Sequence, residues 1–183
     1  LVGCGVTTGV GAALNTAQVT PGSSVAVFGA GGIGVSIIQG ARLAGARQII
    51  AVDLLDSKLQ NARHFGATDT LNPADTDPVK AIKKMTGGGA DFAFEAVGVP
   101  KLLEQAFYCL APRGTAVGVS GVDAREAAGG SATTARVSRS RFWLASAVRL
   151  TRTVRRHAGT MTASEPAKTA NTDAASTAVS RII

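Results

Sequence analysis

Short apolar runs alternate with amphipathic segments along the first two thirds of the chain. The apolar runs, which we predict to be strands, are 25–28, 48–52, 68–71, 91–98 and 115–119. The segments between them repeat apolar residues every three or four positions, which predicts helices over 35–43, 54–65, 78–86 and 101–110. Because strands and helices alternate, the pattern predicts an α/β fold with right-handed crossovers and helices on both faces of a parallel sheet.

Small residues dominate the segment before the first strand. Residues 1–17 are rich in Gly, Ala, Val and Thr, which suits a helix packed very close to other backbone, and Thr7 or Thr8 is the expected N-cap. Further along, Asp77 followed by Pro78 predicts another helix start. We expect Leu55, Leu59 and Phe65 to face inward from the helix over 54–65.

The first strand runs directly into a glycine-rich loop with the sequence Gly-Ala-Gly-Gly-Ile-Gly over 29–34. This is the dinucleotide-binding pattern in its structural context, between a strand and a helix. Gly29 allows a sharp turn, Gly31 allows the backbone to approach a pyrophosphate, and Gly34 allows the helix to pack tightly on the strand. The helix N-terminus then offers unpaired N–H groups to the phosphates.

An acidic residue follows the second strand at the expected distance. Asp53 lies 19 residues beyond Gly34, where a carboxylate can accept hydrogen bonds from the adenosine ribose hydroxyls. The same carboxylate would repel a ribose phosphate, so the sequence predicts NAD rather than NADP. The alternative is a glycine-rich tight turn in an α/β protein that binds no nucleotide.

The alternating pattern stops beyond Gly121. We therefore predict a dinucleotide-binding domain over 1–122, lacking the last strand or strands of its sheet, and a tail over 123–183. The tail is rich in Ala, Ser, Thr and Arg, and we expect it to be largely disordered, with a possible basic amphipathic helix over 136–157. The abrupt change also suggests that the tail is a frame-shifted reading of a GC-rich gene, which sequencing the locus would test.

The net charge of +7 belongs mainly to the tail. Residues 1–121 carry nine Lys and Arg against eight Asp and Glu, whereas residues 122–183 carry ten against four. The charge of the first part therefore gives no reason to expect nucleic-acid binding there. Arg-rich stretches with interleaved apolar residues leave open a nucleic-acid or anionic-membrane role for the tail alone.

Two cysteines, Cys4 and Cys109, suggest no disulfide framework, so we expect reduced thiols and a cytoplasmic location. No uninterrupted apolar run reaches 18 residues, so the sequence predicts no membrane span. Cys109, His64 and His157 have no metal-ligand spacing to other Cys or His residues. We interpret Cys109 as a core residue and His64 as a surface residue.

Several motifs in register resemble the zinc-dependent medium-chain alcohol dehydrogenases, near the thiol-linked formaldehyde dehydrogenase branch. In chain order the motifs are Gly-Cys-Gly-Val-Thr-Thr-Gly over 3–9, the glycine loop over 29–34, Ala-Val-Asp over 51–53, Phe-Gly-Ala-Thr over 65–68, and Phe-Glu-Ala-Val-Gly over 94–98. The resemblance covers about residues 1–122. It implies oxidation of an alcohol by hydride transfer to NAD, with zinc as a Lewis acid.

The resemblance also implies roles for individual positions. Thr8 and Ile33 fall where the family contacts the nicotinamide, and Lys58 falls where a lysine reaches the adenosine ribose beside Asp53. Val97 falls on the adenine–ribose side of the site, and Gly32 belongs to the pyrophosphate loop. Without the resemblance, Thr8 is a helix-cap residue and Lys58 a solvated helix lysine.

Cys4 falls where the family places its third catalytic zinc ligand, and a thiolate is a suitable zinc ligand. Without the resemblance, the alternative for Cys4 is a small buried apolar residue. The family's other zinc ligands lie in a catalytic domain that this sequence does not contain, and one Cys cannot build a three-ligand site. We therefore expect no complete catalytic site in this chain, and an alcohol or aldehyde as the substrate of the assembled enzyme.

Two functional hypotheses follow. In the first, the chain is the NAD-binding part of a zinc-dependent alcohol dehydrogenase, joined by a catalytic domain or by further copies in a homo-oligomer. In the second, the fold is a non-catalytic nucleotide-binding module. Absence of NAD binding would exclude both hypotheses, and tightly bound stoichiometric zinc would contradict the expected incomplete zinc site.

Overall fold

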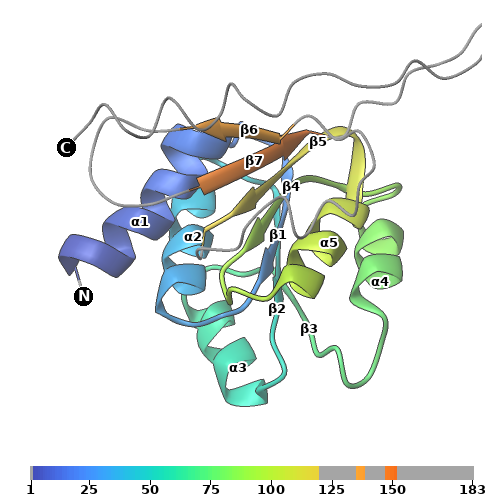
Figure 1. Cartoon of the computed structure of the whole chain (residues 1–183). Coiled ribbons are helices and arrows are strands. Elements are labelled where there is room, and N and C mark those ends of the chain that lie inside the picture. The colour runs from blue at the N-terminus through green and yellow to red at the C-terminus, as the bar shows by residue number, and fades with distance from the viewer. Residues whose placement is uncertain (1, 120–134, 139–146, 152–183) are drawn as a thin grey trace, which may run out of the picture.

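The computed structural model describes residues 2–119, 135–138 and 147–151. Its centre is a sheet covered by helices on both faces, so that the described part of the chain has three layers (Figure 1). The parallel strands are β1 (Ser24–Phe28), β2 (Gln48–Val52), β3 (Asp69–Leu71), β4 (Ala90–Glu95) and β5 (Leu110–Gly118). Their order is β3-β2-β1-β4-β5, which confirms the predicted doubly wound parallel sheet.

Helices connect the parallel strands as the sequence pattern predicts. They are α2 (Gly32–Leu43), α3 (Asp56–His64), α4 (Pro78–Met85) and α5 (Pro100–Tyr108). A helical segment precedes β1 and consists of η1 (Val2–Val6), α1 (Thr7–Gly11) and η2 (Ala12–Ala17), of which η1 and η2 are π-helical. This segment, α2 and α3 lie on one side of the sheet, and α4 and α5 lie on the other (Figure 1).

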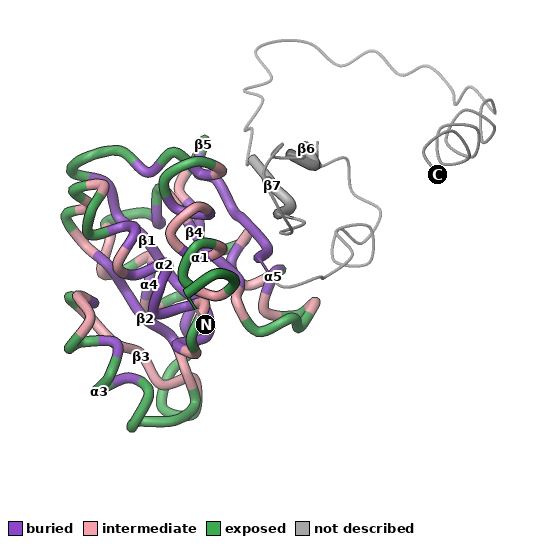
Figure 2. Tube along the Cα trace, turned by 90° about the vertical axis from the view of Figure 1, so that its left-hand side faces the viewer, coloured by how far each residue is buried: buried purple, intermediate pink, exposed green. Residues whose placement is uncertain are grey.

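The strands form the buried centre of the molecule. All five residues of β1 are buried, and so are the last four of β2, as the purple strands in Figure 2 show. Strands that are covered on both faces need continuous apolar runs rather than an alternating pattern. This requirement explains why the sequence pattern identified these two strands correctly.

Small residues bring the first helical segment very close to α2, as predicted. A Cβ placed on Gly9 would lie 2.5 Å from the Ser36 Cβ and 2.6 Å from the Ile33 carbonyl oxygen. A Cβ on Gly40 would lie 2.9 Å from the Ala13 Cβ. Larger residues at either glycine would force the two helices apart, so the helical segment that precedes β1 is fixed against α2 along most of its length.

At the helix termini, one of three sequence predictions is confirmed and two are wrong. Asp77 caps α4 as predicted, because its Oδ1 accepts hydrogen bonds from the N–H groups of Val79 (3.0 Å) and Lys80 (3.3 Å). The expected capping role of Thr7 is wrong, because its hydroxyl lies within the helical segment and donates to the Gly3 carbonyl oxygen (3.0 Å). Leu55 was expected to face inward but is 53% exposed, because α3 begins only at Asp56.

Two strands in the tail correct the sequence prediction. The described residues of the tail form β6 (Ala135–Ser138) and β7 (Ala147–Thr151), where an amphipathic helix was predicted. β7 pairs antiparallel with β5, and β6 pairs antiparallel with β7. The reason is that β5 would otherwise leave a row of unpaired backbone groups at the edge of the sheet. The sheet is therefore extended by antiparallel strands, and the remainder of the tail prediction lies outside the described residues.

Within the described ranges, no helix has both the length and the apolar character needed to cross a lipid bilayer.

Candidate functional site

The glycine loop connects β1 to α2 at the carboxyl edge of the sheet. Gly29 adopts a φ of +93°, which favours glycine, and a Cβ at this position would overlap the Val97 Cγ2. Gly31 is the N-cap of α2, and the first helical hydrogen bond runs from the Val35 N–H to the Gly31 carbonyl oxygen (2.8 Å). The N–H groups that precede Val35 in this turn have no acceptor within the helix, and they point beyond its N-terminus.

Gly31 and Gly34 have opposite surroundings. A Cβ on Gly34 would overlap the carbonyl oxygen of Gly29, so the absence of a side chain there allows α2 to start directly against the end of β1. A Cβ on Gly31 would meet no heavy atom within 4 Å. The space above Gly31 is therefore open, and the tight helix–strand packing predicted at Gly34 is confirmed.

Asp53 follows β2 and is held beside this loop. Its Oδ2 accepts a hydrogen bond from the Ala30 N–H (2.9 Å), and its Oδ1 accepts one from the Leu55 N–H (3.0 Å). Lys58 places its Nζ 3.8 Å from the same Oδ2. The side chain of Asp53 is 10% exposed and that of Lys58 is 46% exposed. The structure thus brings together Asp53, Lys58 and the glycine loop.

Exposed apolar side chains lie on the two sides of the loop. Leu54, next to Asp53 at the end of β2, is 68% exposed, and Val97, beyond the end of β4, is 51% exposed. β1 and its glycine loop lie between these two strands. The sequence analysis did not select Leu54, although an apolar residue directly after the acidic residue of the second strand is a signal that could have identified it.

Thr8 and Ile33 lie where the first helical segment meets α2. Both residues are partly exposed, and Gly9, the neighbour of Thr8, packs against the Ile33 carbonyl oxygen. Ile33 belongs to the first turn of α2, directly after Gly32. This arrangement places the two predicted nicotinamide contacts at the same end of α2 as the glycine loop.

Cys4 is exposed in η1, and the described residues do not fit a zinc site around it. Among these residues, no group of three or more His, Cys, Asp or Glu side chains lies close enough together to hold a metal ion. A zinc site with catalytic function needs three protein ligands. The described residues therefore supply no zinc-dependent step by themselves, and Cys4 stays a predicted ligand position.

Cys109 is buried, as predicted for a core residue. Its Sγ donates a weak hydrogen bond to the Ala106 carbonyl oxygen (3.2 Å). Burial raises the pKa of the Cys109 thiol from 9.0 to about 12, and the nearby Lys83 offsets only part of this effect. The thiolate is the reactive form of cysteine, so Cys109 is chemically inert in the folded chain.

We predict that a thiol reagent modifies Cys4 but not Cys109 in the folded chain at pH 8. A pKa of about 12 leaves roughly one in ten thousand Cys109 side chains ionised at that pH, and burial also blocks the reagent. Mass spectrometry after timed labelling should therefore find one modified cysteine, and two after unfolding in urea. Rapid labelling of Cys109 in the folded chain would contradict the burial described here.

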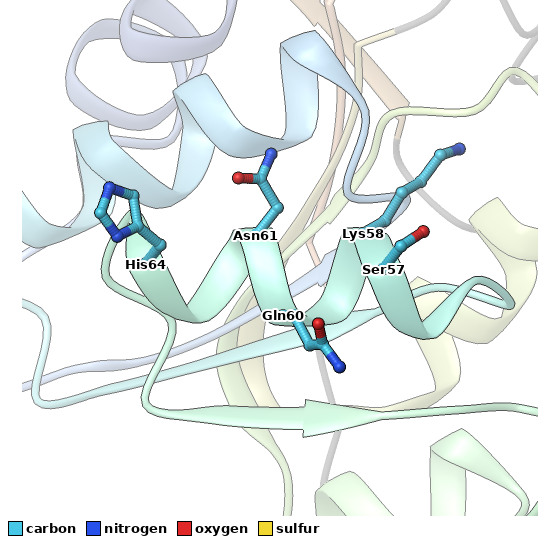
Figure 3. Close-up of a pocket in the computed structure, with 5 residues that line it drawn as sticks. All are labelled: Ser57, Lys58, Gln60, Asn61 and His64. Carbon is cyan, nitrogen blue, oxygen red and sulfur yellow. The ribbon is translucent and has the colours of Figure 1, made fainter.

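One surface hollow is separate from most of these residues. It is an open hollow of about 530 Å³ over α3, lined by Ser57, Lys58, Gln60, Asn61 and His64 (Figure 3). Only Lys58 is shared with the predicted site. His64 is exposed, and its ring packs edge-on against Phe65 with the ring centroids 5.2 Å apart, in agreement with the predicted surface position.

Glu95 is the principal residue that the sequence analysis did not select. It ends β4, is fully buried, and its Oε1 accepts a hydrogen bond from the Val97 N–H (2.8 Å). An acidic residue that ends an otherwise apolar strand was the available signal. The chain nearby has the sequence Phe-Glu-Ala-Val-Gly over 94–98, which was used only for the resemblance.

The strand order and the glycine loop together define a Rossmann-type domain, in which ligands bind at the carboxyl edge where the strand order reverses, here between β1 and β4. Residues 32–162 match the family model described as zinc-binding dehydrogenase. The chain belongs to this zinc-binding dehydrogenase family.

Characterised relatives agree with this assignment. The chain is 52% identical over 111 residues to an S-(hydroxymethyl)glutathione dehydrogenase from Synechocystis sp., a match that covers 60% of this chain and 30% of the relative. Among solved structures, an alcohol dehydrogenase zinc-binding domain protein from Burkholderia ambifaria is 46% identical, with a TM-score of 0.65, over 67% of this chain and 33% of that chain. Benzyl alcohol dehydrogenase from Acinetobacter calcoaceticus is 40% identical, with a TM-score of 0.63, and the match covers 68% of this chain and 37% of that chain. The chain spans about a third of the length of these relatives.

Proposed function

We propose that this chain is the NAD-binding part of a zinc-dependent alcohol dehydrogenase. The observation that carries the proposal is the arrangement of the open glycine loop, the helix N-terminus of α2 and the Asp53 carboxylate at one edge of the sheet. NAD, when bound, accepts a hydride from an alcohol carbon. The described residues bind and orient the coenzyme, and the zinc ligands belong to a catalytic domain supplied elsewhere.

Each part of the edge has a proposed task in coenzyme binding. The N–H groups at the start of α2 bind the pyrophosphate above Gly31, where nothing within 4 Å obstructs it. Asp53 accepts hydrogen bonds from the adenosine ribose, with Lys58 beside it. Leu54 and Val97 supply the apolar surfaces that a base prefers, one on each side of the loop.

Thr8 and Ile33 are proposed to contact the nicotinamide. The nicotinamide lies on the side of the pyrophosphate opposite to the adenosine. Cys4 is proposed as one zinc ligand, which becomes functional only when the other ligands are brought to it. The proposed coenzyme domain comprises residues 1–122, although the family match continues to residue 162 and β7 joins the sheet.

The assembled enzyme is proposed to act on an alcohol or aldehyde in the cytoplasm. The relatives are named for such substrates, namely benzyl alcohol and S-(hydroxymethyl)glutathione. A homo-oligomer or a separate catalytic domain would complete the site. The alternative, a non-catalytic nucleotide-binding module, shares every coenzyme contact and differs only in having no zinc-bearing partner.

Calorimetry with the full chain tests the proposal. We expect NAD to bind at least tenfold more tightly than NADP, a difference of about 1.4 kcal/mol, because the Asp53 carboxylate repels a ribose phosphate. Elemental analysis of the same sample should find much less than one zinc per chain. Absence of NAD binding would contradict the proposal, and tightly bound stoichiometric zinc would contradict the incomplete metal site.

A further inference from the structure

Glu95 is a buried charged side chain to which the proposed function gives no task. Its exposed fraction is 0%, and among the described residues it is the only charged member of the buried set. Burying a carboxylate is unfavourable unless hydrogen bonds compensate for the lost water. The compensation comes from backbone groups of the loop that follows β4, and the position of this loop matters for the coenzyme edge.

One oxygen of Glu95 holds this loop. The Oε1 accepts hydrogen bonds from the N–H groups of Val97 (2.8 Å), Gly98 (2.6 Å) and Val99 (3.4 Å). Val99 is the N-cap of α5, so the carboxylate also lies at the N-terminus of a helix, where a negative charge is stabilised. These contacts fix three successive residues relative to a single side-chain atom.

The backbone on either side of the carboxylate is fixed by the neighbouring strands. The Val119 N–H donates to the Glu95 carbonyl oxygen (2.8 Å), and the Ala96 N–H donates to the Phe28 carbonyl oxygen (2.9 Å). Beyond Ala96 no strand pairing is described, because β4 ends at Glu95. The hydrogen bonds to the Glu95 side chain therefore determine where Val97 lies.

Val97 is the residue through which this loop touches the proposed site. Its Cγ2 occupies the position that a Cβ on Gly29 would require, so the side chain lies directly against the first glycine of the loop. Half of its surface is nevertheless exposed. A half-exposed valine adds little to the core, so holding it in one place contributes more to a binding surface than to stability.

We propose that Glu95 is a positioning residue for the coenzyme site, which places Val97 against the glycine loop on the adenosine side. This inference rests on the proposed NAD-binding function. When the carboxylate is replaced, the loop over 97–99 loses its common acceptor, and Val97 is free to move away from Gly29. The affinity for the adenosine part of the coenzyme then falls.

The test compares Glu95→Gln with Asp91→Asn in the full chain. Asp91 lies on the same strand at its opposite end, where its carboxylate accepts hydrogen bonds from the Ser24 N–H and hydroxyl (both 2.8 Å). In both substitutions an amide side chain replaces a carboxylate that accepts hydrogen bonds from backbone N–H groups. We expect Glu95→Gln to raise the Kd for ADP-ribose and for NAD by the same factor, about tenfold, and Asp91→Asn to leave both within about twofold.

The comparison of ADP-ribose with NAD shows which part of the coenzyme loses affinity, and the double-mutant cycle with Val97→Ala separates positioning from a general loss of structure. ADP-ribose has the adenosine and pyrophosphate but lacks the nicotinamide, so an equal effect assigns the loss to the adenosine side. A Glu95→Gln variant that binds both ligands as tightly as Asp91→Asn would overturn the inference while leaving the proposed function intact. Failure of the unsubstituted chain to bind either ligand would instead overturn the proposed function.

A double-mutant cycle with Val97→Ala keeps the inference testable if Glu95→Gln folds poorly. Glu95→Asp, which retains the charge but shortens the side chain, then replaces it in the cycle. If the carboxylate acts through Val97, the fold-changes of the single variants will not multiply in the double variant. Fold-changes that multiply fully would show that Glu95 and Val97 act independently and would overturn the inference.

Discussion

Replacing Gly34 by alanine is expected to lower the free energy of unfolding by about 3 kcal/mol, at the upper end for overpacking. The added Cβ would overlap the carbonyl oxygen of Gly29, a backbone atom that cannot rotate away as a side chain can. Relief would require α2 to shift away from β1, and α2 is itself pinned against the first helical segment through Gly9 and Gly40. Urea unfolding followed by circular dichroism measures the loss.

Gly31→Ala is the matched control for this prediction. Gly31 has a φ of −76° and no heavy atom near its missing side chain, so alanine meets no clash, and only its weaker N-capping should lower the free energy of unfolding, by about 1 kcal/mol or less. The same variant should lose NAD binding, because its Cβ fills the space reserved for the pyrophosphate. Equal destabilisation by the two substitutions would contradict the different roles assigned to these glycines.

Asp53→Ala is expected to weaken NAD binding about 100-fold, or roughly 2.7 kcal/mol. The carboxylate accepts hydrogen bonds from the Ala30 and Leu55 N–H groups, so its removal frees the glycine loop as well as deleting the proposed ribose contact. The affinity for NADP should fall much less, because the repulsion of the ribose phosphate disappears with the charge. Calorimetric titration with both coenzymes measures the ratio.

Two lysine variants provide the controls for Asp53. Lys58→Met removes the ion pair with Asp53, in which the Lys58 Nζ lies 3.8 Å from the Asp53 Oδ2. Because the lysine is half-exposed, the expected loss in NAD affinity is about threefold. Lys80→Met removes a similar pair of 3.7 Å with Asp77 on α4, away from the coenzyme edge, and should leave NAD affinity unchanged. An unchanged preference for NAD over NADP in Asp53→Ala would contradict the proposed role of the carboxylate.

The first prediction concerns stability and the second concerns coenzyme binding, so neither requires turnover. The chain spans about a third of the length of its relatives, and the described residues hold no group of three metal-ligating side chains. Binding can therefore be measured in this chain alone, whereas alcohol oxidation requires the remaining zinc ligands.

The succession of parallel strands and helices along the chain was readable from the sequence because each element carries its own local pattern. β1 and β2 are continuous apolar runs because both faces of the sheet are covered. Gly29 and Gly34 were assigned correct structural tasks because backbone geometry and close packing at a strand–helix turn depend on the nearest few residues. Asp53 was found by its spacing, which the length of α2 fixes.

The tertiary structure decided what depends on residues that are distant in sequence. Two smaller departures are local: the Thr7 hydroxyl donates to the Gly3 carbonyl oxygen of its own helical segment, and Leu55 is exposed because α3 begins only at Asp56. The pairing of β7 with β5 could not be predicted, because an edge accepts a strand according to its free backbone groups rather than its side chains.

Glu95 shows, within the proposed site, the same difference between what the sequence predicts and what the tertiary structure decides. The sequence places an acidic residue at the end of the fourth strand and the glycine loop more than 60 residues earlier. Only the pairing of β1 with β4 brings Val97 against Gly29 and gives the carboxylate a loop to hold. The sequence by itself therefore determined the elements up to β5 and the glycine loop, whereas the sheet's strand order determined which residues meet there, because strand pairing joins residues that no local pattern connects.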